Sequence, residues 1–371
     1  MSFFPFNENF SFGERIYNEQ LINKLLGRKT VHCDLSNAAA IIENKTVLVT
    51  GGAGFIGSQL CRTILALGCA RLIIYDHWEN GLFYIDRKLE PIYKGKYILI
   101  NGSVTSPEKI TEIFSRYNPS LVFHAAANKH VPLVEQNPRQ GILTNLLGTI
   151  FTARACAVCG CEQFVLISTD KAVNPVSVMG ASKRAAEIAV QLINQQSSTV
   201  FSCVRFGNVF CSTGSVGEIF MNQIKRREPV TITHPAMTRY FMTVTEAVNL
   251  VLKSCETACG GEIFTLDMGS QVSVLELAHK MIESAGLTVN KDIPVIFTGI
   301  RSGEKLTEEL FEKNEKVIST AHPKILLNAP LPLAENIPEL LTTVENEIFS
   351  ADINRLLYLL SQIVPNFNHH R

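Results

Sequence analysis

Three chemically functional side chains follow a predicted buried strand. Thr169, Asp170 and Lys171 come directly after the apolar run Phe164–Ser168. Ligands of parallel sheets bind at the carboxyl ends of the strands. Burying a hydroxyl, a carboxylate and an amine without a purpose costs free energy, so this segment is the first candidate for an active site. The alternative is an Asp–Lys surface pair in a loop, because charged residues are common on protein surfaces.

A glycine-rich turn supplies a second signal. The stretch Thr50-Gly51-Gly52-Ala53-Gly54-Phe55-Ile56-Gly57 follows a predicted strand and opens a predicted helix. Gly51 permits the tight turn, Gly54 lets the backbone approach a pyrophosphate, and Gly57 lets the helix and the strand pack closely. The free N–H groups of the helix N-terminus attract phosphates. In this context the glycines predict a dinucleotide site rather than an ordinary turn.

The second predicted strand ends at Asp76, about 20 residues beyond the last glycine. A carboxylate there accepts hydrogen bonds from ribose hydroxyls and repels a 2′-phosphate, so NAD is favoured over NADP. The alternative is that Asp76 caps the following helix. Arg87 and Lys88 lie downstream and weigh toward NADP.

The elements that position these residues alternate along the chain. Apolar, β-branched runs alternate with stretches of helical spacing, which indicates a parallel sheet covered on both faces and a doubly wound (Rossmann) α/β fold. We expect an N-terminal extension at 1–45, a dinucleotide-binding domain at 46–205, and mainly a smaller substrate-binding lobe with C-terminal helices at 206–371. The predicted strands are Thr46–Thr50, Arg71–Tyr75, Lys96–Ile100, Leu121–His124, Phe164–Ser168, Thr199–Arg205, Val230–Ile232 and Pro294–Phe297. The predicted helices are Glu19–Leu26, Ile56–Leu67, Pro107–Arg116, Val244–Cys255, Val274–Ala285 and the region Ile337–Ile363.

Composition narrows the functional classes. The 371 residues carry 34 Lys plus Arg and 34 Asp plus Glu, so net charge gives no reason to expect nucleic acid or an anionic membrane. The ten cysteines lie mostly in apolar stretches, which is typical of reduced core residues. The cluster Cys156, Cys159 and Cys161 lacks a second half with metal-ligand spacing, so no metal is predicted. We expect no secretory signal, no membrane span and a cytoplasmic location.

The motifs together resemble a known family. The stretch STDKAVNPVSVMGASKR resembles the UDP-N-acetylglucosamine 4,6-dehydratases of polysaccharide biosynthesis, within the extended short-chain dehydrogenase/reductases. It is most similar to the branch in which Met replaces the usual catalytic Tyr, here Met179, four residues before Lys183. The resemblance runs from about Leu26 to the end, and its further motifs are 25–28, 128–133, 205–209, 238–243 and 299–305. Departures are Trp78 after Asp76-His77 and Ser302 in place of Pro.

The resemblance implies a reaction and its residues. NAD removes hydride from C4 of the sugar, water leaves from C5 and C6, and the hydride returns to C6. Lys171 removes the C5 proton and Asp170 protonates the departing C6 hydroxyl. Thr169 hydrogen-bonds O4 in place of the missing Tyr, and Lys183 holds the cofactor ribose. We expect burial and the nearby Lys183 to lower the pKa of Lys171.

The remaining site predictions concern binding. The expected cofactor-binding residues are Gly51, Gly54, Phe55, Ile56, Gly57, Asp76, Ser103, Val104, Ala125, Ala126, Ala127, Asn145 and Lys183. The expected residues for a UDP-N-acetylhexosamine are Lys129, His130, Asn208, Arg239, Arg301 and Glu304. The two arginines are the candidates for the diphosphate, because guanidinium matches phosphate oxygens in bidentate fashion. The resemblance also implies a homo-oligomer.

Two alternatives stay open. A UDP-sugar epimerase would share the NAD and UDP sites, but it normally needs the Tyr that Met179 replaces. A non-catalytic dinucleotide-binding protein is favoured by Met179, since a thioether cannot exchange a proton, and opposed by the Asp170-Lys171 pair.

Overall fold

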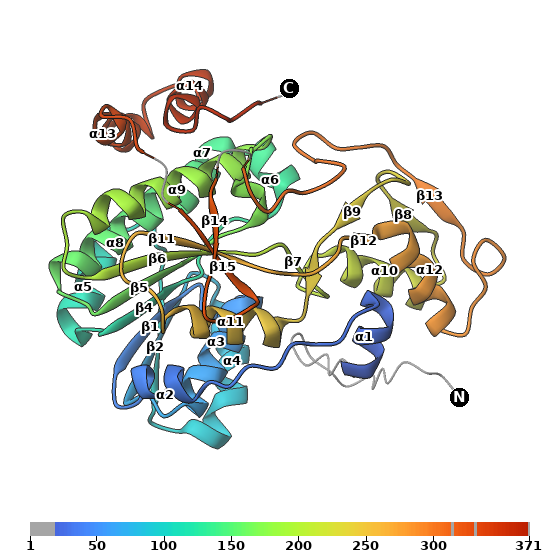
Figure 1. Cartoon of the computed structure of the whole chain (residues 1–371), viewed down its shortest axis with the longest axis horizontal. Helices are drawn as coiled ribbons and strands as arrows, with labels where there is room; N and C mark the ends of the chain where they lie inside the picture. The colour runs from blue at the N-terminus through green and yellow to red at the C-terminus, as the bar shows by residue number, and fades with distance from the viewer. Residues whose placement is uncertain (1–18, 313–314, 330–331, 370–371) are drawn as a thin grey trace.

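The computed structural model describes residues 19–312, 315–329 and 332–369, and a large twisted sheet forms its centre (Figure 1). Of the predicted extension at 1–45, residues 1–18 lie outside the described part. The rest contains α1 (Glu19–Leu26), as predicted, and α2 (Ser36–Ile42).

Nine strands of the described chain make up this sheet. Their order is β14 (Val317–Ser319), β15 (Ile325–Asn328), β11 (Glu262–Leu266), β6 (Val200–Arg205), β5 (Gln163–Ile167), β4 (Leu121–His124), β1 (Thr46–Thr50), β2 (Arg71–Asp76) and β3 (Tyr97–Asn101). All neighbours pair in parallel except β15, which is antiparallel to β11 and β14. The chain order reverses between β1 and β4, where a doubly wound fold binds its ligand. The predicted fold class is confirmed, and the six strands predicted before residue 206 begin and end within one residue of the observed positions.

Helices cover both faces because the strands are apolar on both. Leu48 of β1 packs in one core, and its neighbours Val47 and Val49 pack in the other. The first face carries α5 (Pro107–Tyr117), α6 (Val131–Gln136), α7 (Pro138–Ile142), a π-helical turn at Leu143–Leu147, α8 (Gly148–Val158), α9 (Val178–Asn194), α13 (Ile337–Glu347) and α14 (Ile353–Ile363). The second face carries α2, α3 (Phe55–Ala66), α4 (Glu79–Tyr93) and α11 (Val244–Ser254). The region predicted as helical at 337–363 is thus two helices.

A smaller lobe extends from the carboxyl edge of the sheet (Figure 1). It contains α1, β7 (Asn208–Val209), α10 (Val216–Lys225), β8 (Val230–Ile232), β9 (Thr238–Arg239), β10 (Phe241–Met242), β12 (Val272–Ser273), α12 (Val274–Ser284) and β13 (Val295–Phe297). These elements share a third hydrophobic core. The segment 206–371 therefore does more than build the lobe, because β11, β14 and β15 return to the main sheet and α14 packs on α9.

One continuous helical stretch bears on the prediction that the chain has no membrane span. Residues Pro138–Val158 are long and apolar enough, by length and composition, to span a membrane. About two thirds of the tested window, 67%, is buried inside the protein, where α8 packs against α5 and α9. Such burial is typical of a core helix, because a globular interior selects the same apolar side chains as a bilayer.

Candidate functional site

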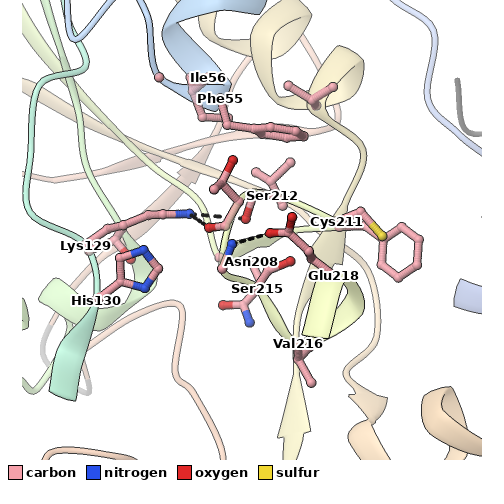
Figure 2. A pocket seen from close by; sticks show the side chains of 18 of the residues that line it. Phe55, Ile56, Lys129, His130, Asn208, Cys211, Ser212, Ser215, Val216 and Glu218 are labelled. Carbon is pink, nitrogen blue, oxygen red and sulfur yellow. Dashed lines mark hydrogen bonds between the residues drawn. The ribbon is translucent and has the colours of Figure 1, made fainter. Parts of the chain in front are cut away.

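A cavity of about 1140 Å³ runs from the glycine turn of the sheet to the lobe. Its sheet side is lined by the turn at 51–57, by Ala125 and Ala127 after β4, and by the segment after β5. Its lobe side is lined by 206–220, Arg239 and the loop at 301–308. Figure 2 shows the part near Lys129, where side chains from both halves of the molecule face one another. The cavity is large enough for two ligands of nucleotide size, since drug-sized sites measure roughly 300–1,000 Å³.

The glycine turn has the form that a pyrophosphate requires. Gly51 has φ +66°, and a Cβ atom on it would lie 2.6 Å from the backbone N of Ala126. A Cβ atom on Gly57 would lie 2.0 Å from the carbonyl oxygen of Gly51. Gly54 is the N-cap residue of α3 and contributes no side-chain cap. The turn thus packs against neighbouring backbone too closely to admit a side chain at Gly51 or Gly57, and the first N–H groups of α3 are free to bind an anion.

Asp76 fixes this turn rather than lining the cavity. Its Oδ2 accepts a hydrogen bond from Ala53 N at 2.9 Å, and its Oδ1 accepts one from Trp78 N at 2.9 Å. Trp78 is the N-cap residue of α4. The carboxylate thus ties the glycine turn to the start of α4, as the helix-start alternative expects, and the role of Asp76 in binding a ribose stays a prediction. It lies beside the turn, where each carboxylate oxygen retains a lone pair for a ribose hydroxyl.

The predicted catalytic segment lies at the carboxyl end of β5, in a short 3₁₀ turn at Asp170–Ala172. Thr169 Oγ1 donates to Asp170 Oδ1 at 3.0 Å. Lys171 Nζ donates to the same oxygen at 2.9 Å and to Asn208 Oδ1 at 3.1 Å. Asp170 is 1% exposed, and its Oδ2 has no hydrogen-bond partner in the described structure. A surface ion pair is excluded, because the carboxylate is buried and oriented by two neighbours.

The charge on Lys171 differs from the prediction. Burial alone would lower its pKa, but the carboxylates of Asp170 and Glu308 outweigh burial and raise it. Glu308 Oε1 lies 3.3 Å from Lys171 Nζ. The expectation that Lys183 would lower this pKa is wrong, because Lys183 is not among the charged groups that shift it. Burial raises the pKa of Asp170, against the opposing charge of Lys171. The prediction was wrong because it did not count the charge of the neighbouring Asp170, nor that of Glu308, which comes from a distant loop.

Met179 and Lys183 lie one turn apart on α9 and both line the cavity. Ser177 starts this helix, since its side chain accepts a hydrogen bond from Gly180 N at 3.1 Å. Lys183 is 4% exposed, and its Nζ has no hydrogen-bond partner among the described residues. Burial lowers the pKa of Lys183 to about 8, although Glu187 opposes the shift. A buried ammonium without a partner is costly, and ribose hydroxyls would satisfy it.

Comparison with known proteins is consistent with this architecture. Residues 47–330 match the family described as "Polysaccharide biosynthesis protein". The chain belongs to this family.

Its relatives differ in length and include proteins of polysaccharide biosynthesis and epimerases. The probable polysaccharide biosynthesis protein EpsC of Bacillus subtilis is 44% identical over 339 residues, which cover 90% of this chain and 56% of EpsC. The chain spans about half the length of the first curated relatives it matches. The UDP-glucose 4-epimerase of Rickettsia bellii is 36% identical over 280 residues, covering 73% of this chain and 79% of the epimerase.

Solved structures agree on the fold. The X-ray structure of Pen from Bacillus thuringiensis superposes with a TM-score of 0.73 at 29% identity, covering 82% of this chain and 98% of Pen. Other structures with this fold are complexes with NAD.

The predicted catalytic and binding residues fall into two groups, those that line the cavity and those that do not. The cavity is lined by Gly51, Gly54, Phe55, Ile56, Gly57, Ala125, Ala127, Lys129, His130, Thr169, Lys171, Met179, Lys183, Asn208, Arg239, Arg301 and Glu304. The predicted residues outside its lining are Asp76, Ser103, Val104, Ala126, Asn145 and Asp170. Asn145 is fully buried and bonds the backbone of Asn128 at 2.7 and 3.0 Å, so it holds the wall of the cavity. Ser103 accepts from Tyr75 Oη at 2.7 Å through its carbonyl, and Val104 is buried.

The cations predicted for the diphosphate are positioned on the lobe. Arg239, on β9, is 6% exposed and donates from Nη1 to the carbonyl oxygens of Thr238 and Leu306. Arg301 is exposed at the cavity rim, and its N–H donates to Glu304 Oε2 at 3.2 Å. On the sheet side, burial lowers the pKa of Lys129, whose Nζ donates to Thr213 O at 2.8 Å.

Sequence reasoning missed two features of the site. Glu308 is buried against Lys171 but comes from a loop without helical or strand periodicity. Arg205 and Glu187, both fully buried, form an ion pair at 2.8 Å beneath the site. Glu187 also accepts from Ser168 Oγ at 2.6 Å, next to the catalytic segment. The only local signal for these buried charges was a charged residue beside an apolar stretch, such as Arg205 after Val200–Val204.

Proposed function

We propose that this chain carries the catalytic unit of an NAD-dependent 4,6-dehydratase acting on a UDP-N-acetylhexosamine. The observation that carries the proposal is the cluster in which Thr169 and Lys171 line a cavity that also contains the glycine turn, while Asp170 is buried behind them and hydrogen-bonded to both. A hydroxyl, an acid and an amine at one strand end are the groups that an elimination needs. The membership in a polysaccharide biosynthesis family supports a sugar nucleotide as the substrate.

The residues present fit NAD. The glycine turn of Gly51, Gly54 and Gly57 lines the cavity and would hold the pyrophosphate, and the Lys183 ammonium, which has no hydrogen-bond partner among the described residues, would hold a ribose. The carboxylate of Asp76 would repel a 2′-phosphate. When bound, NAD supplies the acceptor for the sugar C4 hydride and its return to C6.

The side chains handle the protons. Thr169 hydrogen-bonds O4 and passes its proton along the existing 3.0 Å contact to Asp170. The burial that raises the pKa of Asp170 lets it keep that proton until the C6 hydroxyl departs as water. Lys171 removes the C5 proton, which the C4 ketone has acidified. The proton released from O4 thereby ends in the departing water, so this part of the reaction balances.

The substrate's diphosphate requires local cations, because the chain has no net charge. Arg239 and Arg301 line the lobe side of the cavity and would bind it. Arg239 would exchange contacts with its own backbone carbonyls for phosphate oxygens. Lys129, His130 and Asn208 would line the sugar pocket.

A UDP-sugar epimerase is the second candidate, favoured by the similarity to the UDP-glucose 4-epimerase of Rickettsia bellii. Met179 argues against it, because no hydroxyl stands one turn before Lys183 to take the O4 proton. The experiment is NMR of the product formed from UDP-N-acetylglucosamine and NAD in deuterated water. A C6 methyl group and deuterium at C5 support the dehydratase. An epimer that keeps its C6 hydroxyl selects the epimerase, and bound substrate without any turnover selects the non-catalytic alternative.

A further inference from the structure

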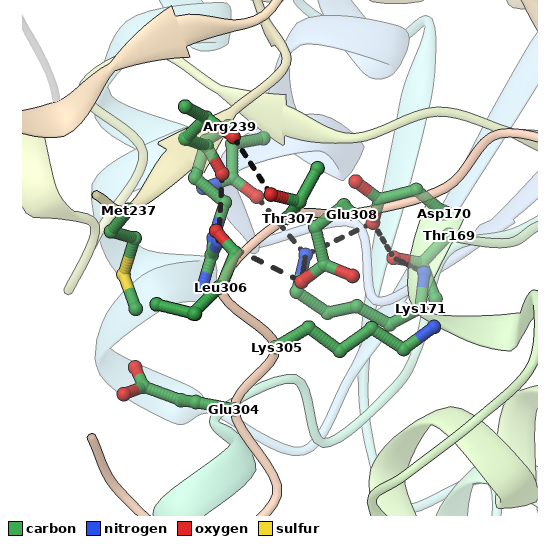
Figure 3. Close-up of polar contacts among 12 residues, drawn as sticks. Thr169, Asp170, Lys171, Met237, Arg239, Glu304, Lys305, Leu306, Thr307 and Glu308 are labelled. Carbon is green, nitrogen blue, oxygen red and sulfur yellow. Dashed lines mark hydrogen bonds and ion pairs between the residues drawn. The ribbon is translucent and has the colours of Figure 1, made fainter. Parts of the chain in front are cut away.

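Glu308 is a second buried carboxylate on the catalytic lysine. It is 3% exposed, and its Oε1 lies 3.3 Å from Lys171 Nζ. Its Oε2 is buried without a hydrogen-bond partner in the described structure, and the residue lines the cavity. Figure 3 shows Glu308 and Asp170 on two sides of the Lys171 ammonium. The geometry thus provides one amine with two possible proton acceptors.

The loop that carries Glu308 is fixed to the lobe. Gln271 Nε2 donates to the carbonyl oxygen of Glu308 at 2.9 Å, and Arg239 Nη1 donates to that of Leu306 at 3.0 Å. Arg239 Nε also lies 3.9 Å from Glu308 Oε1. Burial would raise the pKa of Glu308, but the cations Lys171, Arg239 and Lys305 outweigh burial and lower it. The Asp170 carboxylate also interacts electrostatically with Glu308. Burying a carboxylate in a cavity wall with one oxygen lacking a hydrogen bond costs free energy, so such a group calls for a functional explanation.

The proposed dehydratase reaction needs a group that accepts the proton of the Lys171 ammonium. Asp170 is occupied by the O4 proton when elimination begins, so it cannot accept another. The Lys171 Nζ lies 2.9 Å from Asp170 Oδ1 and 3.3 Å from Glu308 Oε1, and these two carboxylates raise its pKa, which favours the ammonium form. An ammonium cannot remove the C5 proton. A group other than Asp170 must first accept the proton of Lys171, and it must lie within reach of Nζ.

We propose that Glu308 is this acceptor, an inference that rests on the proposed function. The N–H bond of the Lys171 ammonium breaks and an O–H bond forms on Glu308, which leaves a neutral amine and a neutral acid. The amine then takes the C5 proton as water departs with the proton of Asp170. When hydride returns to C6, the Lys171 ammonium protonates C5 and Glu308 returns its proton to the amine. Every group ends in its starting state, and no proton is drawn from outside the site.

The test compares the wild type with E308Q, E308D and the matched control E309Q. Glu309 is the next residue, but its carboxylate is 45% exposed and pairs with Lys305 at 3.2 Å. Each protein is mixed with NAD and UDP-N-acetylglucosamine in deuterated water. Reduced-nicotinamide absorbance reports C4 oxidation, and NMR reports deuterium at C5 and the C6 methyl group. We expect E308Q to bind both ligands and form reduced nicotinamide, but to lose at least ~100-fold in C5 exchange and product. E308D recovers part of the loss, and E309Q matches the wild type.

Other outcomes overturn the proposal. If Glu308 only kept Lys171 charged, removing its charge would lower the pKa of Lys171 and leave E308Q as fast as the wild type, or faster, at neutral pH. Equal loss of C4 oxidation and C5 exchange would indicate a structural role. If E308Q does not fold, E308D decides by the same ratio of C5 exchange to C4 oxidation. A wild-type protein that makes no 6-deoxy product refutes the proposed function itself, before any variant is compared.

Discussion

Replacing Lys183 with Met should stabilise the free protein while removing its response to NAD. The Lys183 ammonium is buried without a hydrogen-bond partner, and burial lowers its pKa from 10.5 to about 8. A pKa difference of one corresponds to about 1.36 kcal/mol. Keeping this charge in the folded protein therefore costs about 3 kcal/mol at neutral pH. Met has a similar length and shape and carries no charge. We therefore expect Lys183→Met to gain up to about 3 kcal/mol in free energy of unfolding at pH 7.

The gain should depend on pH in one direction. Below pH 8 the wild-type lysine is charged in both states, so the folded state bears the full cost. Between pH 8 and about 10.5 the folded protein releases the proton that the unfolded chain still binds, so wild-type stability rises and its deficit shrinks.

The assay is denaturant or thermal unfolding of both proteins at pH 7 and near pH 10, with and without NAD. NAD should stabilise only the wild type. A variant less stable than the free wild type at pH 7, or one that NAD stabilises equally, would refute the argument that Lys183 is held unsatisfied for the cofactor.

Three further predictions follow from the same structure. Gly51→Ala should abolish NAD binding measured by calorimetry, because its Cβ would meet Ala126 N at 2.6 Å. Gly95→Ala is the control, since Gly95 also has a positive φ but a Cβ there would have nothing within 4 Å. It should lower the stability by only about 1–2 kcal/mol and leave NAD binding intact. Glu187→Gln should lower the free energy of unfolding by about 3–5 kcal/mol in urea titrations, because it leaves the buried Arg205 partly uncompensated; a loss under 1 kcal/mol would contradict this. Asp170→Asn should bind NAD normally and make no 4-keto-6-deoxy product by NMR, and full product formation would remove its assigned role.

Local pattern predicted much of this fold. The alternation of β-branched runs and helical stretches located β1 to β6, since strands buried on both faces must be apolar throughout. The glycine spacing located the phosphate cradle, because backbone conformation at Gly51 is a local property. The position of Asp170 and Lys171 after an apolar run placed them at the carboxyl edge of the sheet. Each of these conclusions depends on residues close together in the chain.

Only the tertiary structure decided what surrounds those residues. The irregular loop at 301–308 carries no periodicity, so nothing local indicated that Glu308 would meet Lys171. The expected direction of the Lys171 pKa is reversed because the Asp170 carboxylate and this second carboxylate, Glu308, together outweigh burial. The return of β11, β14 and β15 to the sheet was equally invisible, since short strands late in the chain pair by long-range contact. The sequence by itself thus located the groups that follow the strands, whereas the chain's path through space brought Glu308 to Lys171 and set the direction of the lysine pKa.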